Sequence, residues 1–390
     1  MEINKDRYSE LLNWLNEALE KELSDVVFLE LKKDVHINNE ITLNEDIPIP
    51  IKSDYLIKGI ESDKFSEDIP LYDLVDSMVY LIGCNNHFKY NNKYIEIIKK
   101  LTKEIDAFLL NKASEFTKNK EYLNSLIYLR ALKEISDKHH DVIRYNIAYT
   151  LKQISTEKGA ESASKSQKQY GKMYYELSYY EFLKLSEDFP EYDKVHYELG
   201  FYYLEKEDYE SAKDELEKAY RFNEDGDLKK SISDLLSNVN DIIAFEKGKS
   251  YVIEGKAEEG LKILIPLTQR YKDFNEASYY TALGYRKLGN YAKTKLILEE
   301  LIKKGESSPE IDNELGLCYF YDGEYKKAAE SFEKALKMKD SDVGCMCNLG
   351  FTYYQLGLVD KAIHYIKKAY ELNPEDEITK KSWSWIQNLK

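Results

Sequence analysis

The chain has 390 residues, with 56 Lys and Arg against 71 Asp and Glu, so its formal net charge is −15. This acidic balance argues against nucleic-acid binding, which depends on cations that neutralise phosphates, and against an anionic membrane surface. No stretch approaches the roughly 18 apolar residues that a membrane span needs. Four cysteines are also too few for a disulfide framework in so long a chain. We therefore expect a cytoplasmic protein.

Residues 1–100 are expected to form a small α+β module. Residues 26–31 have strand character, and a small hairpin is predicted around Asn38 and Asn39. The alternating segment 47–51 contains prolines, which restrict it to an edge strand or an extended segment. Amphipathic or apolar helices are predicted over residues 8–23, 71–84 and 94–110.

Residues 101–192 show a divergent form of helical repeat. Apolar residues at helical spacing predict one hairpin over 106–139, and 143–151 begins another whose partner helix is 170–185. The small and polar residues of 155–168 form either a loop or a pair of helix extensions. This stretch is the one we expect to be most mobile.

A period of 34 residues marks the second half of the chain. Its clearest sign is a set of glycines, each with a tyrosine four residues upstream: Gly255, Gly289, Gly323 and Gly357. Each unit is predicted to be a helix, a glycine-centred turn and a second helix, because glycine tolerates the positive φ needed there. An earlier unit has Glu207 at the turn. One such hairpin cannot bury its apolar face alone, so neighbouring hairpins must stack.

This pattern resembles the tetratricopeptide repeat, a 34-residue helical hairpin. The residues that match its signature are Leu349, Gly350, Tyr353, Ala362, Ala369 and Pro374. The resemblance covers residues 193–376. It implies a fold that is all-α in the main, a right-handed α-solenoid of about seven stacked hairpins.

Two departures from the repeat are predicted within and after this array. Fourteen extra residues, 227–240, continue the helical spacing and predict a lengthened helix near 227–254. Residues 377–390 are expected to form a capping helix that covers the last apolar face of the array.

The sequence contains no recognisable catalytic or metal-binding motif. His139 and His140 are adjacent, so on a helix their side chains point in different directions. Cys318, Cys345 and Cys347 lie on consecutive first helices, but a zinc site needs four ligands, and small buried thiols are the simpler interpretation. We expect no catalytic residues, no metal and no cofactor.

The first helices of stacked hairpins line an inner groove, and helical phase places mainly aromatic residues on that side. The predicted groove residues are Tyr197, Phe201, Phe245, Lys249, Tyr279, Arg286, Asn313, Leu317, Phe320, Cys347, Phe351 and Tyr354. Large rings of this kind often anchor a bound partner. For any single one of them, packing between repeats explains the position equally well.

The resemblance implies that this groove holds an extended or helical segment of another protein. The best-known members of the family clamp a C-terminal carboxylate with Lys and Asn residues on successive first helices. Here the available polar donors are Lys249, Arg286, Lys287 and Asn313, among aromatic neighbours. This set favours an apolar or amphipathic segment over a carboxylate clamp.

Three hypotheses for function follow. The first is a non-enzymatic protein-interaction scaffold that binds a partner peptide or helix, and neither nucleic acid nor membrane. The second is a peptide-responsive regulatory sensor, although residues 1–100 lack a recognisable basic helix-turn-helix. The third is an enzyme or substrate adaptor with its activity in the N-terminal module, which a deep pocket with convergent polar groups in residues 1–100 would indicate.

Overall fold

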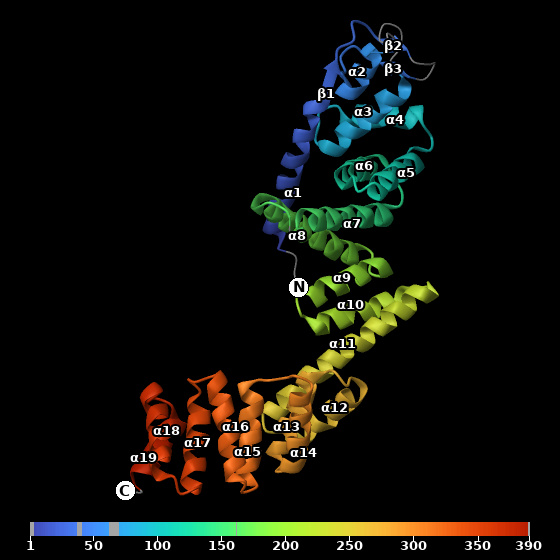
Figure 1. The fold of residues 1–390 in the computed structure, drawn as a ribbon. Helices are drawn as coiled ribbons and strands as arrows, with labels where there is room; N and C mark the ends of the chain where they lie inside the picture. Colours follow the sequence, from blue (N-terminus) through green and yellow to red (C-terminus); the bar gives the residue numbers. More distant parts are fainter. Residues whose placement is uncertain (1–3, 37–40, 62–69, 161, 389–390) are drawn as a thin grey trace. The chain divides into compact units, whose positions relative to one another are not determined.

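A computed structural model describes residues 4–36, 41–61, 70–160 and 162–388, and most of them are α-helical (Figure 1). The helices form stacked antiparallel pairs, and a few short strands lie near the N-terminus. This arrangement confirms the predicted fold class. The chain divides into two compact units, Met1–Asp234 and Leu235–Lys390, and each is described by itself.

The strands of the first unit pair as two antiparallel ladders. β1 (Val26–Leu29) pairs with β4 (Ile49–Lys52), and β2 (Val35–His36) pairs with β3 (Thr42–Leu43). Pro50 stands opposite Phe28 in a sheet of two strands, where a residue without a backbone N–H is tolerated. The turn predicted at Asn38 and Asn39 lies outside the described residues.

The N-terminal helices differ from the sequence prediction at two places, a helix over 53–61 that the pattern did not predict and a break near residue 102. They are α1 (Lys5–Glu20), the 3-10 helix η1 (Lys21–Asp25), α2 (Ser53–Glu61), α3 (Leu71–Cys84) and α4 (Asn91–Leu101). The single helix predicted over 94–110 is wrong, because the backbone is extended at Thr102 (φ −143°, ψ 124°) and a new helix begins at Ile105. The break frees this new helix to pack antiparallel to the helix that follows it.

Three hairpins complete the first unit. Their helices are α5 (Ile105–Lys118), α6 (Tyr122–Ile135), α7 (His140–Lys158), α8 (Lys165–Asp188), α9 (Asp193–Glu205) and α10 (Tyr209–Phe222). Of the two alternatives for residues 155–168, helix extension is correct for most of the stretch. The N-terminus of α8 is stabilised by a capping box in which Ser164 and Gln167 bond to each other's backbone N–H groups.

One apolar core joins the N-terminal elements to the first hairpins. It extends from Leu11 on α1 to Leu177 on α8, so it crosses the predicted domain boundary near residue 100. Beside this core lies a buried charge network around Asp76 of α3, which is 1 % exposed. Its carboxylate accepts hydrogen bonds from Lys52 Nζ (3.0 Å), Lys112 Nζ and the hydroxyl of Tyr128 (2.7 Å). Asp76 therefore ties β4, α3, α5 and α6 together.

The second unit continues the helical hairpins. Its elements are the latter part of α11 (Gly226–Ile253), then α12 (Ala257–Arg270), α13 (Asn275–Lys287), α14 (Tyr291–Lys303), α15 (Pro309–Tyr321), α16 (Tyr325–Met338), α17 (Val343–Gln355), α18 (Val359–Leu372) and α19 (Glu377–Gln387). The lengthened helix predicted near 227–254 is present as α11. Among the described residues, no helix has both the length and the apolar character needed to cross a bilayer.

The repeat glycines have the conformations that the period predicts. Those at the turns have φ between 73° and 87°, whereas the earlier unit has Glu207 there with φ 58°. In the last two hairpins a second glycine, Gly316 or Gly350, permits close packing of the two helices. A Cβ added at Gly350 would lie 2.5 Å from Ile366 Cγ1, closer than real Cβ atoms approach.

Candidate functional site

The predicted groove residues of the second unit lie on α11, α13, α15 and α17, the first helices of its hairpins. At the α11 end, Phe245 is buried and its ring centroid lies 4.6 Å from that of Phe274. The ammonium group of Lys249 lies 5.4 Å from the centre of the Phe245 ring and bonds Glu276 (3.1 Å). Lys249 is therefore already engaged within the unit.

An ion pair joins α13 to α15. Arg286 Nε donates to the carboxylate of Glu314, which is buried. Burial raises the pKa of the Glu314 carboxyl, and Arg286 opposes that rise. Burial also raises the pKa of Tyr279, and the negative charges of Glu314 and Glu310 raise it further. Tyr279 thus keeps its hydroxyl proton and remains a hydrogen-bond donor.

Two amides and two apolar side chains continue the row along α15 and α17. Asn348 Nδ2 donates to Asn313 Oδ1 (3.2 Å), and both side chains are partly exposed. Leu317 and Phe320 are also partly exposed, and the Phe320 ring meets that of Tyr325 edge-on. An amide offers one acceptor and two donors, so this pair can bond to the N–H and C=O groups of a peptide backbone.

Two of the aromatic side chains predicted to line the groove are covered by the C-terminal helix α19. The ring of Trp385 on α19 lies 4.9 Å from that of Phe351 and 4.9 Å from that of Tyr354. Cys347, on the same helix as these two aromatics, is buried. Phe351 and Tyr354 thus pack against α19, and the open part of the row lies on α13 and α15.

The remaining two predicted residues belong to the first unit. Tyr197 and Phe201 lie on α9, where their rings meet edge-on with centroids 4.9 Å apart. Phe201 also lies near a cation, since Lys152 Nζ is 5.9 Å from its ring centre. The other predicted groove residues all lie within the second unit.

Sequence reasoning missed three residues that shape this row: Glu314, Asn348 and Trp385. Glu314 and Asn348 lie one position away from the helical phase that selected the groove residues, yet their side chains reach the same neighbours. A search that also took the flanking positions would have found both. The sequence predicts only that Trp385 lies on a capping helix. Its contacts with Phe351 and Tyr354 depend on the path of α19.

The cysteines are buried, in agreement with the prediction of small interior thiols. Burial raises the pKa of Cys318 to about 11 and that of Cys345 to about 12, so both remain protonated at neutral pH. Within the part of the chain that the structure describes, His, Cys, Asp and Glu side chains do not gather into a group that could hold a metal ion.

Comparison with known proteins agrees with this geometry. Models of the tetratricopeptide repeat match residues 193–225, 276–304, 313–342 and 345–376. These matches and the observed helical hairpins confirm the predicted resemblance, and the chain contains tetratricopeptide repeats. The comparison with curated proteins gave no significant match.

Several solved structures are distantly similar. One is a thermophilic repeat protein in Thermus thermophilus, at 18% identity and a TM-score of 0.34, with 50% of this chain and 99% of that chain covered. Another is a repeat protein from Parabacteroides merdae, at 14% identity and a TM-score of 0.34, with 73% and 100% covered. MamA from Desulfovibrio magneticus has 17% identity and a TM-score of 0.34, with 47% and 97% covered.

Proposed function

We propose that this protein is a non-enzymatic interaction scaffold that binds an amphipathic peptide or helix of another protein. The binding surface is the first-helix face, which we define as Tyr279, Arg286, Asn313, Leu317 and Phe320 on α13 and α15, together with Asn348 on α17. Stacked helical hairpins commonly use the surface lined by their first helices for such binding. The observation that carries the proposal is the Asn313–Asn348 amide pair beside the partly exposed Leu317 and Phe320.

The charges of this face favour a partner segment that carries Lys or Arg beside its apolar residues. Arg286 is neutralised by Glu314, and Lys249 by Glu276. Glu310, on the exposed side of α15, adds a negative charge near Tyr279. Lys287, the third candidate cation, donates to the carbonyl oxygens of Val252 and Ile253. Because all three cations already have partners, a carboxylate clamp has little support. Complementary charge would instead orient a basic amphipathic segment.

The face can hold such a segment in two ways at once. Leu317 and Phe320 offer apolar contact area, which is the usual source of affinity at an interface centre. Asn313 and Asn348 offer donors and acceptors that fix the direction of the bound backbone. An apolar helix would use the first feature, and an extended strand would use both.

The proposal is tested with the double variant Asn313→Ala/Phe320→Ala and the control Leu296→Ala. Leu296 is an apolar side chain of the same unit, but it lies on the second helix α14 and is 68 % exposed. Partners are captured from the native cell with the full chain, their bound segment is mapped, and its synthetic peptide is titrated by calorimetry. We expect the double variant to bind the peptide at least about tenfold more weakly, since an interface hot spot contributes about 2 kcal/mol or more.

The control should bind the peptide as the unaltered chain does, and all three proteins should keep the same circular dichroism. Equal affinity in the double variant would remove the first-helix face from the proposal. An acidic bound segment would contradict the charge argument.

A further inference from the structure

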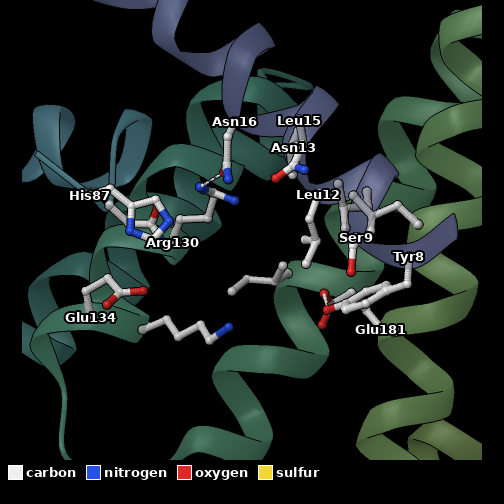
Figure 2. Close-up of a pocket in the computed structure, with 15 residues that line it drawn as sticks. Tyr8, Ser9, Leu12, Asn13, Leu15, Asn16, His87, Arg130, Glu134 and Glu181 are labelled. Atoms are coloured by element: carbon white, nitrogen blue, oxygen red, sulfur yellow. Dashed lines mark hydrogen bonds between the residues drawn. The ribbon is translucent and has the colours of Figure 1, made fainter. Parts of the chain in front are cut away.

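A second candidate site lies in the first unit, apart from the first-helix face and independent of the proposal above. It is a cavity of about 290 Å³ enclosed by α1, α6, α7 and α8 (Figure 2). Its floor is apolar and consists of Leu15, Ile147, Leu151 and Leu177, all of them buried. Its rim is exposed and polar. This combination is typical of small-molecule sites, which pair an apolar lining with a few placed polar groups.

Arg130 of α6 reaches one side of the cavity. Its Nε donates to the carbonyl oxygen of Gly83 (3.0 Å), and its Nη2 donates to Asn16 Oδ1 (2.7 Å). Both acceptors are neutral. Among the residues that the structure describes, no carboxylate forms an ion pair with this guanidinium, and its Nη1 has no hydrogen-bond partner. Burial lowers the pKa of Arg130, and this effect outweighs the opposing effect of the Glu134 and Glu181 charges.

Glu181 of α8 faces the same cavity and is 8 % exposed. Its Oε1 accepts a hydrogen bond from the hydroxyl of Tyr8 (2.6 Å). Burial and the Glu181 charge both raise the pKa of Tyr8, so that hydroxyl keeps its proton and donates. Across the described ranges, no cation forms an ion pair with the Glu181 carboxylate.

The lining of the cavity thus includes a cation, Arg130, and a largely buried carboxylate, Glu181, that lack an ion-pair partner among the described residues, whereas Lys133 and Glu134 lie on its exposed rim. Figure 2 shows Arg130 with Asn16 on one side, Tyr8 with Glu181 on the other, and Leu12 between them. Charged groups removed from water are normally paired, because an unpaired one loses its hydration without compensation. Arg130 and Glu181 do not pair with each other, so the missing counter-charges would have to come from a bound molecule.

We propose that this cavity binds a small zwitterion with an apolar body, either a free amino acid or a dipeptide. Its carboxylate would pair with Arg130, its ammonium group with Glu181, and its side chain would cover the leucine and isoleucine floor. The cavity volume equals that of about ten water molecules, since each occupies about 30 Å³ in the liquid. This volume suits a leucine-sized ligand.

The first experiment uses the unaltered full chain. L-leucine, L-phenylalanine and leucyl-leucine are titrated by calorimetry, and each is compared with its C-terminal amide and its N-acetyl derivative. We expect at least one of the three zwitterions to bind, and both of its capped forms to bind at least tenfold more weakly, because each lacks one charge. Inorganic phosphate is included as a simple anion.

The second experiment uses Arg130→Gln and Glu181→Gln, with Lys172→Gln and Glu157→Gln as controls. The control residues are exposed, lie on α8 and α7 outside the cavity lining, and undergo the same kinds of charge change. Each cavity variant should weaken binding of the zwitterion at least tenfold, and each control less than threefold. Glu181→Gln can still accept the hydrogen bond from Tyr8, and circular dichroism checks folding.

Four results would overturn the proposal. They are no binding of any of the three zwitterions at millimolar concentration, equal binding of a capped form, equal loss of affinity in the controls outside the cavity, and phosphate displacing the zwitterion at the same concentration. The experiments with capped ligands use only the unaltered chain, so they remain decisive if a variant fails to fold.

Discussion

The buried charge of Asp76 gives the sharpest test of what holds the first unit together. Asp76→Asn removes the negative charge between Lys52 and Lys112 with little change in side-chain volume. The asparagine oxygen can still accept one or two of the present hydrogen bonds, from Tyr55 or Tyr128 for example. Both lysines would lose their counter-charge while their side chains remain only 23 % and 16 % exposed.

The expected loss of stability can be worked out from this geometry. Removing one partner of a buried ion pair typically costs about 3–5 kcal/mol. Because both lysines have some access to water and can turn toward it, we expect the lower end, about 3 kcal/mol. In a unit of this length each kcal/mol shifts the melting midpoint by roughly 2–4 °C, so the midpoint should fall by roughly 6–12 °C.

The pH dependence gives a second readout. Burial opposes ionisation of Asp76, but the ammonium groups of Lys52 and Lys112 and the hydroxyl donors outweigh it and hold its pKa below 3.8. The charge therefore stabilises the folded state above the ordinary carboxyl pKa, and that stabilisation is lost as the pH falls through the lower folded pKa. The stability difference between the unaltered chain and Asp76→Asn should shrink in that acidic range.

Tryptophan fluorescence can follow the first unit alone. The chain has three tryptophans, and Trp383→Phe with Trp385→Phe leaves Trp14, which packs on the core of the first unit. Urea unfolding in this background is compared for Asp76→Asn and for Asp137→Asn, whose carboxylate is exposed. Equal midpoints for the two variants would show that the Asp76 network does not anchor the first unit, and would refute the reasoning.

Two predictions concern glycine and the backbone. Gly350→Ala should destabilise the second unit by about 1–3 kcal/mol, because the new Cβ would overlap Ile366. Gly344→Ala should be neutral or stabilising, because its Cβ would lie 3.4 Å from Asp342 Oδ1, an ordinary contact distance. Urea unfolding followed by circular dichroism distinguishes them, and equal loss in both would contradict the close-packing argument. Glu207→Gly should stabilise the first unit by about 0.5–1 kcal/mol and raise its urea midpoint, because its φ of 58° strains a residue with a Cβ. A lower midpoint in this variant would show that the turn is not strained.

Local and periodic features were predictable from the sequence. The turn glycines follow from the 34-residue period, and the lengthened helix α11 follows from the helical spacing of the fourteen extra residues, since both features depend on residues near in the sequence. The exception was the helix predicted over 94–110. Apolar spacing continues across the break at Thr102, so the pattern alone gave no signal for it.

The candidate site was predictable only in part. The repeat register placed Tyr279, Asn313 and Phe320 on first helices, where the structure has them, because each hairpin is set by residues near in the sequence. That these side chains form one binding face stays a prediction. It did not show that Trp385 packs on Phe351 and Tyr354, since that contact depends on where the chain goes after the last hairpin.

The sequence by itself determined the repeat, its hairpins and the acidic surface, because these depend on composition and on spacing of a few turns. The tertiary structure alone decided which distant charges meet. Asp76 gains its lysines from β4 and α5, and Arg130 and Glu181 come to one cavity from α6 and α8 without pairing. Charge carries no periodic signal along the chain, so its partners are set only when separate helices pack.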